Sequence, residues 1–260
     1  MNHRAKKSLG QNFLKSGTIL KKIVSVAEVT ENDIVFEIGP GKGALTSVIL
    51  ETGAKVIAIE KDDSLIPILH ESFMDKISSG KFILVNGDVL RCEPKSLGLK
   101  NKKWKLVANI PYYITGMIIR QFLEADSQPQ SMTILVQREV AKRIVARDEK
   151  ESILSLSVKL YGTPTYEGTV PRRYFSPAPN VDSAILHIAD IGERKISKKD
   201  AETFFTLIKT AFAHKRKTAV HNLGPVYGKE KLIAKLIELG YDERVRAEDL
   251  KLSDWLILMK

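Results

Sequence analysis

A strand, a glycine-rich turn and a helix follow one another between residues 33 and 51, and this succession narrows the possible folds most. Asp33 to Ile38 is an apolar run typical of a buried strand, and it leads directly into Gly39-Pro40-Gly41-Lys42-Gly43. Ala44 to Glu51 has its apolar residues at helical spacing, and Lys55 to Glu60 is a second apolar run. Strand, helix and strand in this order predict a βαβ unit with parallel strands and a right-handed connection.

Strand and helix patterns continue to alternate beyond this unit. Apolar runs predict further strands at Lys81 to Asn86, Trp104 to Ala108 and Met132 to Val136. Helical spacing predicts helices at Asp62 to Ile77, Thr115 to Ala125 and Glu139 to Ala146. Two later runs are also interpreted as strands, near the far edge of the sheet: Ile153 to Tyr161 and Val181 to Ile188. The alternation indicates an α/β domain with a mostly parallel sheet.

The character of the sequence changes after Ala189. Residues 192–199 are polar and charged, and we interpret them as a linker. Beyond them, Phe204 to Phe212 and Leu232 to Ile237 repeat apolar residues at helical spacing, and Ser197 with Asp200 resembles a helix-start box. We therefore predict two domains: an α/β domain over residues 1–190 and a small all-helical domain over residues 191–260.

The charge balance points to a polyanionic partner. The chain has 41 Lys and Arg against 31 Asp and Glu, a formal net charge of +10. Nucleic acid is the commonest polyanion for such an excess, although some cytosolic proteins are basic without a specific reason. The first acidic residue is Glu28, and we interpret the lysine-rich start as a basic arm and not as a cleaved leader.

Cysteine and histidine usage argues for a reducing compartment and against a metal site. Cys92 is the single cysteine, so no internal disulfide can form, which favours a cytoplasmic location. The five histidines are scattered without paired spacing, so we expect no metal site. No run of about 18 apolar residues is present, and we expect no membrane span.

The tetrapeptide Asn109-Ile110-Pro111-Tyr112 suits the binding of a flat base through its exocyclic amine. The side-chain oxygen of Asn109 and the backbone carbonyl of Ile110 can both accept from an amino group. Pro111 favours an extended Ile110, which helps to aim that carbonyl, and Tyr112 supplies a ring for stacking. Taken alone, the same residues also fit a loop after a buried strand.

The glycine turn and its downstream acids indicate a nucleoside cofactor. Gly39 and Gly41 permit a close approach of the backbone to a ligand, and Glu60 ends the next strand, where a carboxylate can accept ribose hydroxyls. Asp88 can accept from an adenine amine, although a turn or helix-cap role is as plausible. The glycine spacing departs from the dinucleotide pattern, and the set fits S-adenosyl-L-methionine better than NAD. An NAD dehydrogenase would also need a proton-transfer residue, and the sequence offers no good candidate.

With these residues in place, the chain resembles the ribosomal RNA adenine N6-dimethyltransferases, the family of bacterial KsgA and its archaeal and eukaryotic counterparts. The resemblance covers nearly the whole chain. Its motifs stand in the expected order: Ser8-Leu9-Gly10-Gln11-Asn12-Phe13-Leu14, Glu37 to Thr46, Glu60, Gly87-Asp88, Asn109 to Tyr112, Phe175 to Ser183, Ala211-Phe212 with Lys215-Arg216-Lys217, and Arg246 to Leu250. Tyr113 departs from the Asn usual in bacterial relatives and looks more like the archaeal and eukaryotic branch.

The resemblance implies a Rossmann-like class I methyltransferase domain followed by a helical RNA-recognition domain. It implies dimethylation of N6 on two adjacent adenosines in the 3′-terminal hairpin of small-subunit rRNA, by a monomer acting on a pre-30S-like particle. The cofactor residues that it implies are Gln11, Asn12, Leu14, Gly39, Gly41, Glu60, Lys61, Asp88, Val89 and Asn109. The catalytic residues are Asn109, Ile110, Pro111, Tyr112 and Phe175, where Phe175 would stack on the second face of the base unless it is a core aromatic. RNA contacts are expected at Arg4, Lys6, Lys7, Arg172, Arg173, Lys215, Arg216 and Lys217, although any single lysine here is more often a solvated surface residue.

Two rival functions stay open at the level of sequence. An Erm-like enzyme would methylate adenine in large-subunit rRNA, although Val181-Asp182-Ser183 and Arg246 to Leu250 look more like the small-subunit enzymes. An assembly factor would act on the small subunit mainly by binding. The absence of a convincing catalytic His or Cys does not argue against an enzyme, because aligned reactants alone can lower a barrier by roughly 7–11 kcal/mol.

Overall fold

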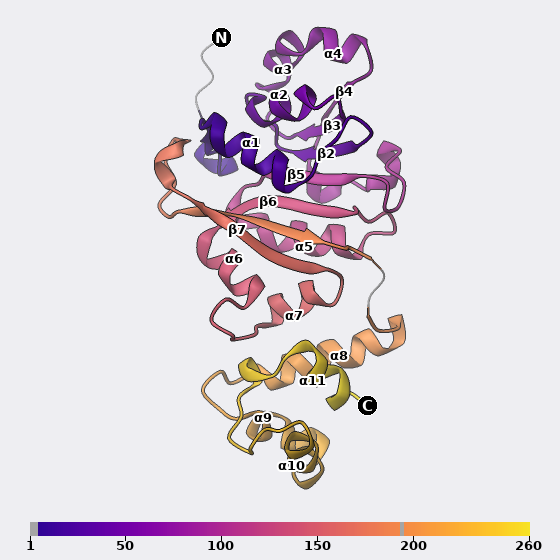
Figure 1. The fold of residues 1–260 in the computed structure, drawn as a ribbon, viewed down its shortest axis with the longest axis vertical. Helices are drawn as coiled ribbons and strands as arrows, with labels where there is room; N and C mark the ends of the chain where they lie inside the picture. Colours follow the sequence, from indigo (N-terminus) through magenta and orange to yellow (C-terminus); the bar gives the residue numbers. More distant parts are fainter. Residues whose placement is uncertain (1–4, 193–194) are drawn as a thin grey trace. The chain divides into compact units, whose positions relative to one another are not determined.

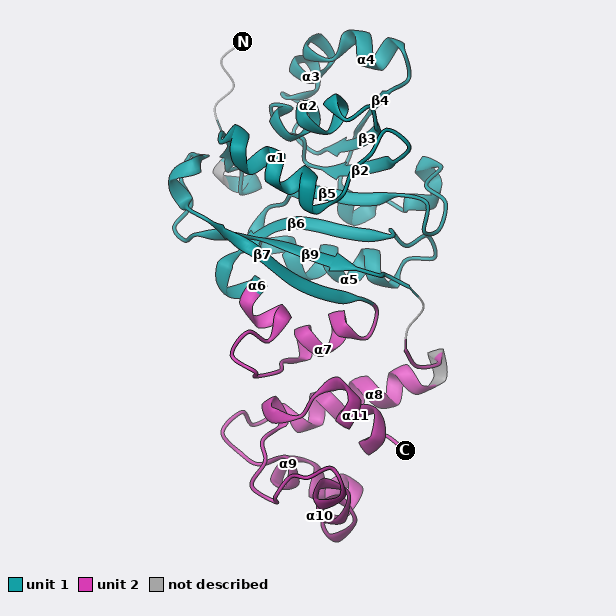
Figure 2. Cartoon of the chain, viewed as in Figure 1, with its two compact units in different colours: residues 1–141, 162–192 teal, residues 142–161, 193–260 magenta. Residues whose placement is uncertain are grey.

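The protein divides into two compact units, which Figure 2 colours separately. The structure is a computed structural model that describes residues 5–192 and 195–260. The first unit contains residues 1–141 and 162–192, and the second contains residues 142–161 and 193–260. Residues 142–161 thus group with the second unit, whereas the sequence predicted one continuous first domain. The predicted linker at 192–199 includes residues 193–194, which lie outside the described ranges.

A seven-stranded sheet forms the centre of the first unit (Figure 1). Its strands are β2 (Ile34–Ile38), β3 (Lys55–Glu60), β4 (Phe82–Asn86), β5 (Lys105–Asn109), β6 (Ser131–Gln137), β7 (Thr163–Val170) and β9 (Ser183–Ala189). They lie in the order β4-β3-β2-β5-β6-β9-β7. The pairs from β4 to β6 are parallel, and β9 is antiparallel to both β6 and β7. A separate pair joins β1 (Phe13–Leu14) to β8 (Phe175–Ser176).

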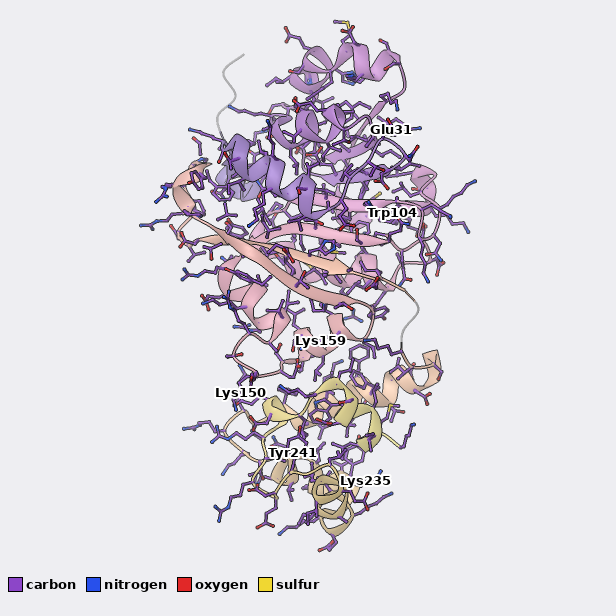
Figure 3. The ribbon with its side chains drawn as sticks, viewed as in Figure 1. Glu31, Trp104, Lys150, Lys159, Lys235 and Tyr241 are labelled. Atoms are coloured by element: carbon purple, nitrogen blue, oxygen red, sulfur yellow. The ribbon has the colours of Figure 1, made fainter. Side chains whose placement is uncertain are left out.

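The two faces of the sheet bury different side chains because neighbouring residues of a strand point in opposite directions. On one face, Val35 joins a buried cluster with residues of α1 (Gly17–Val26) and α2 (Ala44–Glu51). On the other, the Phe36 ring lies 5.8 Å from Trp104, labelled in Figure 3, and 5.7 Å from Phe122 of α5 (Thr115–Glu124), measured between ring centroids. Both faces are apolar, which explains the continuous hydrophobic runs of the strands.

The single helix predicted from Asp62 to Ile77 is two helices, α3 (Ile66–Ser72) and α4 (Met74–Ser78). Phe73 separates them with φ −124° and ψ 24°, which is not helical. Its ring packs against Phe82 at 5.2 Å between centroids and fills the space beside Gly43, where a Cβ would lie 2.4 Å from the ring. Tertiary packing of one aromatic residue therefore ends the first helix.

The strand predicted from Ile153 to Tyr161 was wrong: this segment is helix α7 (Ile153–Lys159). Its apolar residues fit both spacings: Leu154, Leu156 and Val158 alternate as in a strand, while Ile153, Leu156 and Leu160 recur as in a helix. Ser152 and Ser155 form a capping box in which each side chain accepts from the other residue's backbone N–H, and this arrangement starts the helix. The edge strand is the next segment, β7. The strand predicted at Val181 to Ile188 is present as β9, and the other predicted elements are found within a few residues of their expected bounds.

The second unit is helical. It contains α7, α8 (Lys198–Ala211), α9 (Ala219–Tyr227), α10 (Lys229–Glu238) and α11 (Leu252–Leu258), while α6 (Arg138–Val145) spans the division between the units. Phe204, Leu223, Leu236 and Trp255 are buried in its core.

Short 3₁₀ helices complete the described chain: η1 (Lys7–Leu9), η2 (Val89–Arg91), η3 (Pro94–Leu97), η4 (Tyr112–Ile114), η5 (Arg172–Tyr174) and η6 (Ala247–Asp249). Across the described residues, none of the helices has the length and apolar character needed to cross a membrane.

Candidate active site

The predicted cofactor residues of the first unit, and the predicted catalytic residues from Asn109 to Tyr112, meet at the carboxyl ends of β2, β3, β4 and β5. The order of strands reverses between β2 and β5, and open α/β sheets bind ligands outside such a switch point. Two adjoining pockets open here, and Phe13, Gly39, Gly41 and Asn109 line both of them. We call them the first pocket, which extends toward Glu60 and Asp88, and the second pocket, which extends toward Glu37 and Pro177.

Glu60 is fixed at the wall of the first pocket by two backbone donors. Gly41 N–H donates to its Oε2 at 3.0 Å, and Asp62 N–H donates to its Oε1 at 2.9 Å. Burial raises the pKa of Glu60, and these backbone hydrogen bonds oppose that rise. The carboxylate keeps acceptor capacity for a ligand hydroxyl, because it has about four lone-pair sites. Gly41 has φ +61°, and a Cβ there would lie 2.9 Å from the Phe13 ring, so this turn requires glycine.

Asp88 caps a helix, one of the two roles that the sequence allowed, and it also lines the first pocket, where its contact with an adenine amine stays a prediction. Its Oδ1 accepts from the backbone N–H of Leu90 at 3.0 Å, which caps η2, and its Oδ2 pairs with the Lys61 ammonium at 2.8 Å. The hydrogen bond from Lys61 lowers the pKa of Asp88, so the carboxylate is ionised and can accept from an amine. Lys61, Asp88 and Val89 all line the first pocket, as predicted for cofactor residues.

The N-terminal segment closes one side of the first pocket, and Asp62 holds it there. The Gln11 side-chain amide donates to Asp62 Oδ2 at 2.7 Å, and the Lys6 ammonium donates to Oδ1 at 2.6 Å. Gln11 and Asn12 line the first pocket, while Leu14 is buried beside the second. Because the Lys6 ammonium is bound to a buried carboxylate, Lys6 anchors this segment, and its predicted RNA contact stays a prediction.

Asn109 is oriented by the same segment. Its Nδ2 donates to the backbone carbonyl of Asn12 at 3.0 Å, which leaves Oδ1 as the free acceptor of the amide. The next residue, Ile110, is buried, and Pro111 has φ −59° and ψ 131°. The Tyr112 hydroxyl lies 2.6 Å from Ser183 Oγ, which fixes the ring, and burial raises the pKa of Tyr112. All four predicted residues from Asn109 to Tyr112 line the first pocket.

Glu37 is a site residue that the sequence reasoning did not assign. It lines the second pocket, is 1% exposed, and accepts from Thr46 Oγ1 at 2.7 Å. Burial raises its pKa to about 8, with a further contribution from the Glu60 charge. Its position in the sequence could have indicated a site residue. Glu37 stands two residues before the glycine turn, and a carboxylate inside an otherwise apolar strand needs a partner or a function.

Phe175 lies in the hydrophobic core of the first unit in this structure. It is 4% exposed, clusters with Leu14 and Leu20, and pairs with Leu14 between β8 and β1. Phe175 is not among the described residues that line the two pockets. Its neighbours Ser176 and Pro177 line the second pocket. Its predicted stacking role therefore stays a prediction.

The remaining basic candidates lie on exposed parts of the chain. Arg172 donates through its guanidinium to the carbonyl of Asn180 at 3.3 Å, and Arg173 lies over the Tyr174 ring. In the second unit, Lys215, Arg216 and Lys217 are exposed between α8 and α9. Asn222 of α9 fixes this loop by donating to the carbonyls of Ala211 at 2.6 Å and His214 at 3.3 Å. Arg4 and the side chain of Lys7 lie outside the part of the chain that the structure describes.

The fold and the site together define a Rossmann-like class I methyltransferase. The sheet is parallel except for β9, which lies antiparallel between β6 and the edge strand β7, and a pocket suited to a nucleoside lies at the carboxyl ends of the parallel strands. A family model described as ribosomal RNA adenine dimethylase matches residues 2–260. The chain belongs to this family of enzymes, whose cofactor is S-adenosyl-L-methionine.

Named relatives agree with this assignment. The chain is 40% identical over 258 residues to ribosomal RNA small subunit methyltransferase A of Dehalococcoides mccartyi, which covers 98% of this chain and 87% of that protein. It is 39% identical over 264 residues to the protein of the same name from Fusobacterium nucleatum, covering 100% and 98%. Among solved structures, the 23S rRNA methyltransferase ErmE matches with a TM-score of 0.81 and 26% identity over 95% of this chain and 98% of that one. Both relatives named by sequence are bacterial, so they lend no support to the archaeal or eukaryotic branch suggested by Tyr113.

The first pocket suits S-adenosyl-L-methionine on the chemistry of its lining. The Glu60 carboxylate would hold the ribose hydroxyls, and Asp88 would accept from the adenine amine. Ile38, Ile59 and Val89 line the same pocket and offer apolar surface to a flat ring. The glycine turn lets the backbone approach the remainder of the cofactor, where Gly39 and Gly41 connect the first pocket to the second.

Proposed function

We propose that this enzyme dimethylates N6 of two adjacent adenosines in the 3′-terminal hairpin of small-subunit rRNA. We further propose that it acts in the cytoplasm, as a monomer, on a pre-30S-like particle. The hydrogen bond from Asn109 Nδ2 to the Asn12 carbonyl is the observation that best supports this function. It leaves the amide oxygen as the free acceptor of a residue that lines both pockets, and this oxygen can accept from an exocyclic amine.

In this mechanism, two acceptors prepare the amine. Asn109 Oδ1 and the Ile110 carbonyl each accept one N–H of the adenine amino group, which localises the nitrogen lone pair and directs it toward the cofactor. The cofactor, when bound, supplies an electrophilic methyl group on a sulfonium. Because that methyl donor needs no activation by the protein, positioning supplies most of the catalysis. After the first transfer the methylated nitrogen releases one proton to solvent. For the second transfer the amine therefore carries one N–H, so one of the two acceptors must yield.

The target base has to leave its stack before it can reach Asn109. The Tyr112 ring, held by Ser183, offers a stacking face worth about 1–3 kcal/mol. Phe175 would offer the second face only after its ring leaves the core. RNA binding is proposed to be dominated by phosphate contacts from the exposed Arg172, Arg173, Lys215, Arg216 and Lys217. In this proposal, residues 191–260 serve as a helical RNA-recognition domain.

The decisive experiment is transfer of tritiated methyl groups to unmethylated small and large ribosomal subunits, presented separately, with identification of the labelled nucleoside. We expect N6,N6-dimethyladenosine at two adjacent adenosines near the 3′ end of small-subunit rRNA. Label on large subunits alone would instead support the second candidate function, which the structural match to ErmE favours. Binding to small subunits without any transfer would support an assembly factor.

A further inference from the structure

Three apolar side chains are exposed beside the first pocket, where burial would be expected. Tyr113 is 62% exposed, Met117 is 50% exposed and Leu90 is 37% exposed. Tyr113 and Leu90 line the first pocket, while Leu90 and Met117 line an open groove that adjoins it. We call these three residues the outer lip. The outer lip is thus continuous with the active site, and the mechanism described above leaves it without a role.

The outer lip is built on fixed elements. The Tyr113 ring packs on Gly10, where a Cβ would lie 3.2 Å from Cε1 of the ring, and Gly10 has φ +63°. Gln121 of α5 donates to the carbonyls of Val89 and Cys92, each at 2.9 Å, and so clamps η2 with Leu90 against α5. Flat apolar surface held in this way loses little conformational entropy on binding a ligand.

Cations accompany the aromatic ring. Lys61 and Arg91 are both exposed. The Lys61 ammonium pairs with Asp88 at 2.8 Å and lines the first pocket together with Tyr113, while Arg91 lines the adjoining groove together with Leu90. The adjoining groove, which Leu90 and Met117 line, also has acidic side chains in its lining: Glu93, Glu124 and Asp126. An exposed aromatic face with cations beside it is the arrangement that binds unpaired nucleotides, since the ring stacks on the base and the cations attract phosphate.

We propose that the outer lip stacks the nucleotide next to the target adenosine, with Tyr113 as a positioning residue for the substrate. The inference rests on the proposed function, in which the two target adenosines are adjacent. When one adenosine leaves the stack to reach Asn109, the adjacent base loses a stacking partner. The outer lip, which adjoins the pocket of the target base, replaces that partner. The waiting base is then the second substrate of the same enzyme.

The test uses two hairpin RNAs, each with 2-aminopurine in place of one of the two adenosines. We expect its fluorescence to be quenched on binding the full-length enzyme in at least one hairpin. Tyr113→Phe should keep this quenching, and Tyr113→Ala should lose it. Tyr113→Ala should also raise the KM for RNA about tenfold, while the Kd for S-adenosylhomocysteine stays within twofold. Met117→Ala, on the same lip, should produce a smaller rise in KM.

Two results would overturn the inference. Equal quenching by the wild type and Tyr113→Ala would show that the ring does not contact the neighbouring base. A parallel rise in the Kd for S-adenosylhomocysteine would show that Tyr113 covers the cofactor instead. Failure of the proposed function is distinct from both, because the wild type would then transfer no methyl group to small subunits.

Discussion

Asn109 and Asn12 are joined by a hydrogen bond of 3.0 Å from the Asn109 side-chain Nδ2 to the Asn12 backbone carbonyl. The two residues belong to motifs far apart in the chain, at the end of β5 and in the N-terminal segment. Their contact gives the amide of Asn109 a defined orientation, with the oxygen free. The N-terminal segment therefore has a direct effect on the acceptor that we assign to the target amine.

Replacing Asn109 should abolish methyl transfer while sparing substrate binding. We expect Asn109→Ala to lower kcat by about 10²–10³-fold, because a positioned polar partner of the reacting group is lost. Asn109→Asp should also be inactive, since one carboxylate oxygen would face the Asn12 carbonyl without a proton between them. Tritium transfer and small-subunit binding measure the two effects separately. Asn101→Ala, an exposed asparagine outside both pockets, is the control, and persistent methylation by Asn109→Ala would refute the catalytic assignment.

Loss of Asp62 should weaken cofactor binding without touching the cofactor's expected contacts. Asp62→Ala removes the acceptor for Lys6 and Gln11, so the segment that closes the first pocket loses its anchor. We expect the Kd for S-adenosylhomocysteine to rise about tenfold, the effect of roughly 1.4 kcal/mol, in a calorimetric titration. Asp63→Ala removes the same charge from the neighbouring exposed residue and should leave the Kd unchanged. Equal effects of both variants would show that only the local charge matters.

Glu37 should make stability fall as the pH rises. The folded chain holds the Glu37 proton up to a pKa of about 8, whereas the unfolded chain releases it near the ordinary value of 4.5. Between these values the folded state binds more protons, so its free energy of unfolding decreases with pH and levels off above pH 8. Glu37→Gln removes this contribution. We expect urea unfolding from pH 5 to 8 to show that the free energy of unfolding of the wild type falls by on the order of a few kcal/mol more than that of the variant. Parallel pH profiles would contradict the assignment.

Breaking the ion pair between Glu151 and Lys159 should destabilise the second unit. Glu151 is buried and accepts from the Lys159 ammonium at 2.5 Å and from Ser155 Oγ at 2.6 Å; Lys159 is labelled in Figure 3. Lys159→Met leaves the carboxylate without its cation, and we expect a loss of about 2–4 kcal/mol. The double variant Glu151→Gln with Lys159→Met should recover much of this loss in thermal or urea unfolding. A double variant no more stable than Lys159→Met would mean that packing, and not charge, accounts for the loss.

The exposed basic loop of the second unit should contribute to the salt dependence of RNA binding. Changing Lys215, Arg216 and Lys217 to Gln should weaken binding and reduce the slope of log affinity against log salt by about two, since each phosphate contact contributes roughly 0.7–0.9. The matched control changes Lys229, Lys231 and Lys235 of α10 to Gln, which removes the same charge from the same unit. An unchanged slope in the first variant, or an equal change in the control, would count against a specific contact.

The sequence was most informative where function depends on residues close together in the chain. The turn from Gly39 to Gly43, Glu60 at the end of β3, and Asn109 to Tyr112 after β5 each carried a recognisable pattern. The structure brings Gly39 and Gly41 of the turn, Glu60 and all four residues from Asn109 to Tyr112 to the first pocket. Their convergence could be expected, because parallel strands deliver their carboxyl ends to one edge of the sheet. The identity of α7 could not be read in this way, since the apolar residues of this short segment fit the spacing of either a helix or a strand.

The sequence alone thus determined the alternating α/β order, the nucleoside site at the glycine turn and the family of the chain. Local propensity and motif spacing are properties of residues close together in the chain, so they can be read from the sequence without knowledge of the fold. The tertiary structure alone decided that Asn12 orients Asn109, that Asp62 binds Lys6, that Phe175 is buried and that Tyr113 is exposed on a fixed lip. Each of these depends on contacts between residues distant in the chain, whose geometry is set only when the sheet and its connecting segments pack together.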